Sequence, residues 1–274
     1  MVVRNGRTSR AWVMTVALMV GGGGAVGGCA ASGDDGAPGG DPVLTVRDAP
    51  EALTRAGSSK ASTSMEMASG GTRVTIRGEG RYDFRRRTGS LQVVLPKDAA
   101  GGSAHRPITE LLAPGALYMK NRGAGVPADK WVRVDTTALD DGNLVTGGAT
   151  DPAAAAELLR GVRKASYVGE IELAGVKVRH YRGVADIAEA ARLASPQVRG
   201  ALAAAAKGFT TDTVPFDAYL DREGRLRKVR HQFSFSNQGR TVAVASTTLL
   251  YGFGARVTVT LPDRSEIYAG KIEA

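Results

Sequence analysis

The chain has 274 residues, a formal net charge of +9, 43% hydrophobic and 5% aromatic residues, and a single cysteine. One cysteine excludes an internal disulfide framework and a zinc site built on cysteines. The apolar content and the 23% of charged residues are ordinary for a chain that folds around a core, and the length fits one large domain as well as two small ones.

The first 28 residues have the pattern of a secretion signal. Three arginines, at positions 4, 7 and 10, precede an apolar run at residues 11–20 and then small residues up to position 28. The run is too short for a membrane-spanning helix, which needs about 20 residues. A GxGxxG match at Gly22, Gly24 and Gly27 lies inside this segment, so we interpret it as a false positive.

The chain's only cysteine stands directly after this signal. The string Val26-Gly27-Gly28-Cys29 resembles the bacterial lipobox, in which an apolar residue and two small residues precede a cysteine. This resemblance implies a lipoprotein signal peptide at residues 1–28 and a lipidated, palmitate-type anchor on Cys29. The alternative is a plain secretion signal with an incidental cysteine.

Removing the signal leaves 33 basic and 27 acidic residues, a net charge of +6. Export argues against nucleic acid as a partner, and the positive charge is compatible with anionic lipid head groups or with an ordinary solvated surface. Residues 30–42 lack apolar bulk and predict a flexible tether with a reach on the order of 20 Å. We therefore expect a lipidated cysteine and tether at residues 29–47 and one domain at residues 48–274.

Helical signals are short and strand signals are long. We expect helices at residues 50–59, with Asp48 a possible cap, then at residues 151–161, and at residues 184–206, where Ser195-Pro196 restarts the helix.

Residues 73–85 alternate without a break between apolar or small and polar side chains, which predicts a long antiparallel strand with one dry face. Gly78 and Gly80 within it suggest sharp curvature. Shorter alternating runs predict strands around residues 64–68, 91–95, 216–220, 229–235 and 257–261. The sequence therefore predicts an α+β domain, a strongly curved antiparallel sheet with a light cover of helices.

Signals for enzymatic chemistry are poor. His105, His180 and His231 lack metal-ligand spacing, and no common catalytic motif occurs. We expect His231 to be a hydrogen-bonded core residue, Asp140-Asp141 to be a loop turn, and residues 85–87 to be an exposed strand end. The sequence predicts neither an enzyme nor a cofactor or metal site.

Several strings, in a shared order behind the lipobox, resemble the actinobacterial LppX/LprG-type lipoproteins. They are residues 64–67, 116–119 with 130–135, 173–183, 214–221 with 224–226, and 251–254 with 257–262. The chain departs from this family at Gly252, where an acidic residue is usual, and at Arg256, where proline is commoner.

The resemblance implies a LolA-like fold, a curved half-barrel whose concave face is covered by a few helices around an apolar cavity. It also implies a lipid or glycolipid ligand, attachment to the outer face of the plasma membrane, a role in lipid transport, and a possible membrane exporter as partner. The lining residues that we expect are Met65, Met67, Val74, Ile76, Tyr82, Leu91, Val93, Leu117, Val132, Phe216, Val229, Phe233 and Phe235.

Two alternatives remain open at this stage. The same fold could serve as an envelope sensor or interaction module that binds a protein partner. It could also be a tethered structural domain in which the same side chains only pack against the helices. A connected apolar void of several hundred cubic ångströms would favour the lipid carrier.

Overall fold

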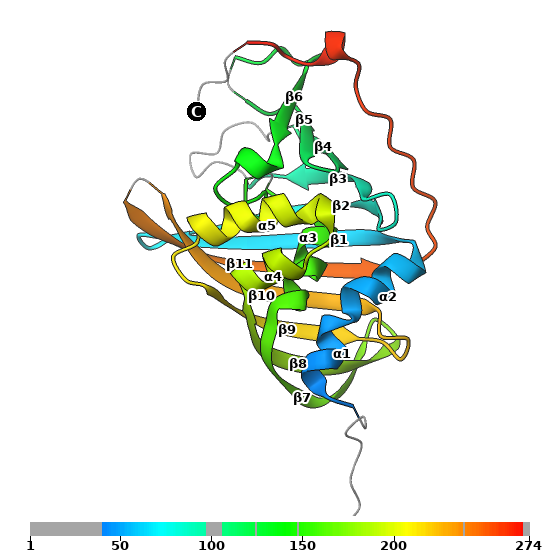
Figure 1. Ribbon diagram of the computed structural model, residues 1–274. Coiled ribbons are helices and arrows are strands. Elements are labelled where there is room, and N and C mark those ends of the chain that lie inside the picture. The colour runs from blue at the N-terminus through cyan, green and yellow to red at the C-terminus, as the bar shows by residue number, and fades with distance from the viewer. Residues whose placement is uncertain (1–39, 97–105, 124, 147, 238, 271–274) are drawn as a thin grey trace, which may run out of the picture. The chain divides into compact units, whose positions relative to one another are not determined.

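A single curved sheet of eleven antiparallel strands forms the frame of the described part of the chain, residues 40–96, 106–123, 125–146, 148–237 and 239–270 of a computed structural model (Figure 1). The strand order is β6-β5-β4-β3-β2-β1-β11-β10-β9-β8-β7, and every neighbouring pair is antiparallel. The expected α+β class with a curved antiparallel sheet is confirmed. The expected signal peptide, Cys29 and His105 lie outside the described residues.

The strands are long in the centre of the sheet and short at one edge. They are β1 (Ser58–Ser69), β2 (Thr72–Asp83), β3 (Thr88–Val94), β4 (Ile108–Ala113), β5 (Ala116–Lys120), β6 (Trp131–Asp135), β7 (Val162–Leu173), β8 (Val176–Asp186), β9 (Thr213–Leu220), β10 (Leu226–Asn237) and β11 (Arg240–Tyr251). The α-helices are α1 (Pro42–Arg47), α2 (Ala49–Ala56), α3 (Pro152–Glu157), α4 (Ile187–Leu193) and α5 (Pro196–Gly208). Three short 3₁₀ helices are η1 (Thr136–Ala138), η2 (Leu158–Gly161) and η3 (Arg264–Glu266).

The unbroken alternation at residues 73–85 becomes β2, which ends at Asp83. A side chain at Gly80 would place its Cβ 1.9 Å from the carbonyl oxygen of Ser90 on β3. The close approach of these two backbones therefore requires glycine, and it accounts for the curvature that the glycine pair suggested.

Helix boundaries differ from the sequence prediction in three places. The helix expected at residues 50–59 ends at Ala56, because Gly57 takes a positive φ of 86° and Ser58 already pairs with Asp83 of β2. Residues 184–186 continue β8, because Val184 and Ala185 still pair with β9, and helix begins only at Ile187, after the cap Asp186. The folded part also begins earlier than expected: residues 42–47 of the expected tether form α1, in which Val46 is fully buried. Asp41 caps this helix by accepting a hydrogen bond from the Val43 amide at 2.8 Å.

The strand expected at residues 257–261 is wrong. β11 lies between β1 and β10, so the chain that leaves Tyr251 finds no free sheet edge to join. It instead runs extended, with no ladder, to the far edge, where the Tyr268 amide donates to the Trp131 carbonyl at 2.8 Å (Figure 1, red).

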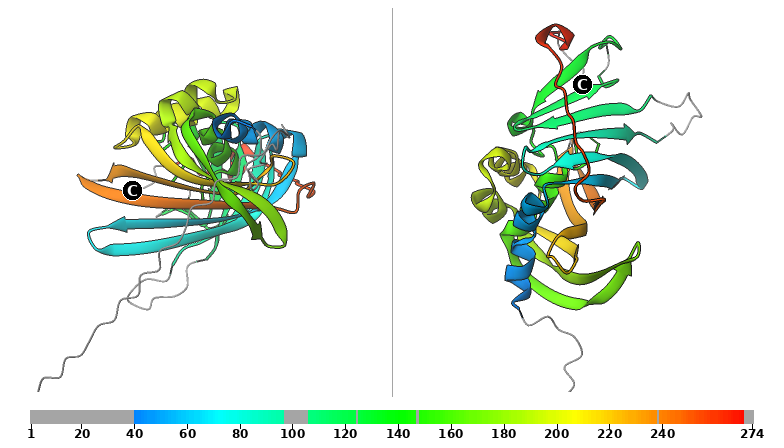
Figure 2. Two further views of the ribbon diagram at one scale, coloured as in Figure 1. Left: turned by 90° about the horizontal axis from the view of Figure 1, so that it is seen from below. Right: turned by 90° about the vertical axis from the view of Figure 1, so that its right-hand side faces the viewer.

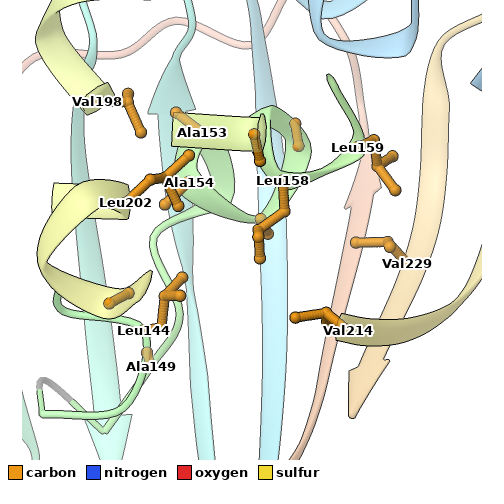
Figure 3. Packing of buried hydrophobic residues seen from close by; sticks show 14 of the residues in the cluster. Leu144, Ala149, Ala153, Ala154, Leu158, Leu159, Val198, Leu202, Val214 and Val229 are labelled. Carbon is orange, nitrogen blue, oxygen red and sulfur yellow. The ribbon is translucent and has the colours of Figure 1, made fainter. Parts of the chain in front are cut away.

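The helices cover one face of the sheet, here called the inner face (Figures 1 and 2). Leu144 enters from the loop before α3, Leu158 from η2 and Leu202 from α5, and all three are fully buried in the same core cluster as strand residues such as Val214 and Val229 (Figure 3). The opposite face, here called the outer face, is polar. The core therefore lies between the sheet and its helical cover.

Candidate functional site

The expected lining residues all lie on the inner face, but most of them are closed off in the core. Eight of them are at most 3% exposed: Met65, Tyr82, Leu91, Val93, Leu117, Val132, Phe216 and Val229. Ile76 and Phe233 are each 6% exposed, and Met67, Val74 and Phe235 are half-buried. Side chains from the helices thus fill the middle of the concavity, and the sheet keeps accessible apolar surface at one end.

That end holds a pocket of about 500 Å³, here called the mouth pocket. Its sheet side is Met67 of β1, Ile76 of β2 and Phe235 of β10. The other side comes from the segment after β5 and from the loop before α3: Arg122, Ala138, Leu139, Asp140, Asp141, Val145, Thr146 and Gly148, with Ser236 completing the rim. An apolar floor therefore meets a polar rim, as in many small-molecule sites.

Asp141 fixes the shape of the rim loop. Its Oδ1 accepts from the Asn143 amide at 3.0 Å, and its Oδ2 accepts from the Val145 amide and the Thr146 hydroxyl, each at 2.9 Å. Arg122 Nη2 donates to the Thr146 carbonyl at 3.3 Å, which ties the rim to the segment after β5. The sequence indicated a loop turn at Asp140-Asp141 but gave no sign that this turn borders a pocket.

Two buried titratable groups also face the interior. Glu110 on β4 lies between Leu91 and Met119, is fully buried, and has no hydrogen-bond partner for either carboxylate oxygen within the described residues. Burial raises the pKa of Glu110 to about 8, against the opposing effect of the positive charge on Arg122 and with a further small rise from Asp151. Glu110 is therefore mostly a neutral acid at pH 7.

His231 on β10 lies opposite Ser246 of β11 and is 1% exposed. Burial lowers its pKa to about 4, so the ring is neutral at pH 7. The prediction of a core position is confirmed, but the expected hydrogen bond is absent at Nε2, which has no partner within the described residues.

The remaining polar predictions resolve as follows. His180 lies on the outer face, where its Nε2 is 2.7 Å from Asp217 Oδ1 and its ring stacks on Tyr219. Arg87 is not an exposed strand end, because its Nη2 donates to the fully buried carboxylate of Glu157 at 2.9 Å. Within the described ranges, no group of three His, Cys, Asp or Glu side chains has a metal-binding arrangement, and no helix there has the length and hydropathy to cross a bilayer.

The outer face carries two hollows of its own. A groove of about 530 Å³ runs over an alanine floor, Ala68, Ala243 and Ala245, between Arg73 and Arg230. A wider hollow of about 810 Å³ lies over β2 and β3. Neither hollow was predicted, because alternation along a strand marks which side chains face outward but not how the twisted face is shaped.

The architecture of the described residues, an open, curved antiparallel sheet with helices across one face, defines the fold class of this protein. Solved structures that are similar to the chain include LprF from Mycobacterium bovis, at 12% identity and a TM-score of 0.41, which covers 83% of this chain and 99% of its own. LppX from Mycobacterium tuberculosis is similar at 10% identity and a TM-score of 0.42, over 81% of this chain and 100% of its own. A LolA superfamily protein from Nitrosomonas europaea is similar at 10% identity and a TM-score of 0.34, over 83% and 97%.

The group that the sequence resembles, the LppX/LprG-type lipoproteins with a LolA-like fold, is thus represented among these structures by LppX and by a LolA superfamily protein. No protein-family model and no curated protein sequence matches the chain. At these identities the likeness concerns the fold, and the site has to be interpreted from its own residues.

Proposed function

We propose that this protein is an envelope lipoprotein, anchored through Cys29 to the outer face of the plasma membrane, that binds part of a lipid or glycolipid in the mouth pocket and carries or presents it. The observation that carries the proposal is the mouth pocket itself. Its volume of about 500 Å³ lies in the usual range for ligand sites, and its floor is Met67, Ile76 and Phe235.

Binding of a hydrocarbon chain in the mouth pocket needs no charged contact. Each buried methylene contributes about 0.8 kcal/mol, so ten methylenes on this floor would contribute about 8 kcal/mol before the cost of immobilising the chain. Met67 is unbranched and adapts to irregular ligands, whereas Phe235 gives a flat wall. Arg122 and the hydroxyl of Thr146 at the rim can donate hydrogen bonds to an ester or sugar oxygen. The proposed activity is binding without chemical change and without a cofactor, and a membrane exporter is the kind of partner that would supply or receive the lipid.

Native mass spectrometry tests this proposal on the lipidated protein, purified in mild detergent from its own host. We expect a non-covalent lipid mass in addition to the anchor. Phe235→Asp should remove this added mass, because a carboxylate on the pocket floor opposes hydrocarbon binding. The matched control is Val94→Asp on the outer face of β3, a residue that is 52% exposed, and it should keep the added mass. A clean mass without added lipid in the wild type would overturn the proposal.

The hypothesis of a protein-interaction module is favoured by one observation, the outer-face groove between Arg73 and Arg230. It predicts a wild type without added lipid and a partner whose binding is lost when the groove is filled. Ala245→Trp would fill the groove floor and leave the mouth pocket untouched. The two hypotheses are therefore separated by two variants on opposite faces of the sheet.

A further inference from the structure

The outer face of β1, β2, β3 and β11 carries a patch of cations. The alternation of β2 places Arg73, Arg77 and Arg81 on this face, each exposed and about 13 Å from the next along the strand. Lys60 on β1 lies opposite Arg81 and is also exposed. Together with Val94 and Tyr251 these residues are here called the basic patch.

These four cations are not neutralised by ion pairs with other described residues. Within the described residues no ion pair joins Lys60, Arg73, Arg77 or Arg81 to a carboxylate. The acidic residues that face outward on the same strands are Glu66, Glu79 and Asp83, and Asp83 is 3.8 Å from Arg86. Some arginines elsewhere are paired: Arg182 contacts Asp217 and Arg225 contacts Asp221. Others in the described part of the chain, such as Arg133 and Arg230, have no ion pair either. Four cations therefore share this face with three carboxylates, a net charge of +1, and the four cations are free of ion pairs within the described residues.

Exposed apolar side chains stand among these cations. Val94 of β3 lies opposite Arg77 and is 52% exposed. Tyr251 of β11 lies opposite Lys60 and is 41% exposed. Register partners across antiparallel strands lie about 5 Å apart, so each apolar side chain has a cation beside it. A tyrosine and an aliphatic residue beside basic residues form the combination that favours a bilayer interface with anionic lipids.

We propose that the basic patch docks on the anionic head groups of a bilayer. Charge complementarity selects this occupant, because the patch spreads three arginines along β2 and a lysine on β1, all without an ion pair in the described residues, and does not concentrate them in one site. The anchor of the proposed function supplies proximity: eleven residues lie between Cys29 and Asp41, and the twelve Cα–Cα steps allow a span of up to about 40 Å. Docking of this face turns α4 and α5 away from the lipid surface (Figure 2). The inference rests on the Cys29 anchor but not on the contents of the mouth pocket.

Site-specific labelling of the full lipidated protein in vesicles tests this docking. If Cys29 is acylated, Val94→Cys provides a unique thiol for a fluorophore, and Gln197→Cys on α5 provides a control position on the helix-covered side. Quenching by neutral acrylamide is compared in phosphatidylcholine vesicles and in vesicles with about one-third phosphatidylglycerol. We expect quenching at position 94 to fall by at least about threefold on the anionic vesicles, to recover at roughly 0.5 M salt, and to be unchanged at position 197.

Charge variants test whether the basic patch causes the fall in quenching at position 94. Changing Arg73, Arg77 and Arg81 together to Gln should restore quenching at position 94, since three arginines near an anionic surface correspond to a roughly 100-fold change in docking. The charge-matched control changes Arg192, Arg199 and Lys207, which are exposed on α4 and α5, to Gln and should have no effect.

Equal quenching at position 94 on both kinds of vesicle, or an equal effect of the two triple variants, would overturn the proposal. Protection of position 94 by an acidic peptide such as polyglutamate, with no protection by anionic vesicles, would overturn it in favour of a protein partner. Labelling of Cys29 itself would show that the anchor has failed, independently of the patch.

Discussion

The buried acid Glu110 makes the stability of this protein depend on pH in a way that one substitution can isolate. Its folded-state pKa is about 8, against an ordinary value of 4.5, because the side chain is fully buried without a hydrogen-bond partner in the described residues. Since the folded pKa lies above the unfolded pKa, the folded state holds a proton that the unfolded state releases between pH 4.5 and pH 8. Stability is therefore fully present below pH 4.5 and is lost progressively as the pH rises through 8.

The magnitude follows from the separation of the two pKa values. Each pH unit in this window corresponds to about 1.4 kcal/mol, so the loss reaches about 3 kcal/mol at pH 7 and about 4 kcal/mol at pH 8. Glu110→Gln keeps the shape of the side chain and removes the titration. We expect the stability of the variant relative to wild type to increase by about 1.4 kcal/mol per pH unit from pH 5 to pH 7.5. His231 titrates identically in both proteins and cancels in this difference.

The assay is urea unfolding of wild type and variant at a series of pH values, with the free energy of unfolding compared at each. Glu66→Gln, on the exposed outer face of β1, is the control, and its stability difference from wild type should not follow this slope. If the difference in free energy of unfolding between Glu110→Gln and wild type stays constant within about 0.5 kcal/mol from pH 5 to pH 8, the inference that Glu110 is enclosed and without a partner is refuted.

Two further predictions concern an ion pair and the anchor. Arg87→Ala leaves the fully buried Glu157 with Arg160 as its remaining cationic partner, so the free energy of unfolding should fall by about 3 kcal/mol in the same urea assay. The control Arg86→Ala, at a side chain that is 77% exposed, should change the free energy of unfolding by less than about 0.5 kcal/mol. Equal effects of the two variants would contradict the buried ion pair. Cys29→Ala should move the protein from the membrane fraction to the medium, as checked by fractionation and immunoblotting, and continued membrane attachment would show that the thiol is not the anchor.

Local sequence signals predicted the elements that one-sided burial dictates. The alternation along β2 and β10 is visible in the sequence because each strand buries one face, and side chains alternate between the faces with period two. The start of α5 was predictable because Pro196 has no amide hydrogen to satisfy and Ser195 takes the N-cap position before it, although the Ser195 hydroxyl makes no capping hydrogen bond within the described residues. The curved α+β class followed from these features together.

The local sequence could not show that residues 257–261 are extended without joining the sheet. Their alternation resembles that of β11, yet a strand also requires a free neighbouring edge, and both edges of β11 are already occupied by β1 and β10. Pairing of β1 with β11 joins segments about 180 residues apart, and nothing local specifies it. The strand prediction for residues 257–261 failed because local alternation contains no information on the order of strands in the sheet.

By itself, the sequence determined which side chains face inward, since Met67, Val74 and Phe235 alternate with polar or small neighbours just as Met65 and Val229 do. Only the tertiary structure decided which of them stay accessible. Leu144, Leu158 and Leu202 arrive from distant segments and fill the middle of the concavity, whereas the loop held by Asp141 leaves one end open. Alternation in the sequence shows which side chains of a strand avoid water. How closely the helices and loops cover those side chains depends on packing across the whole chain.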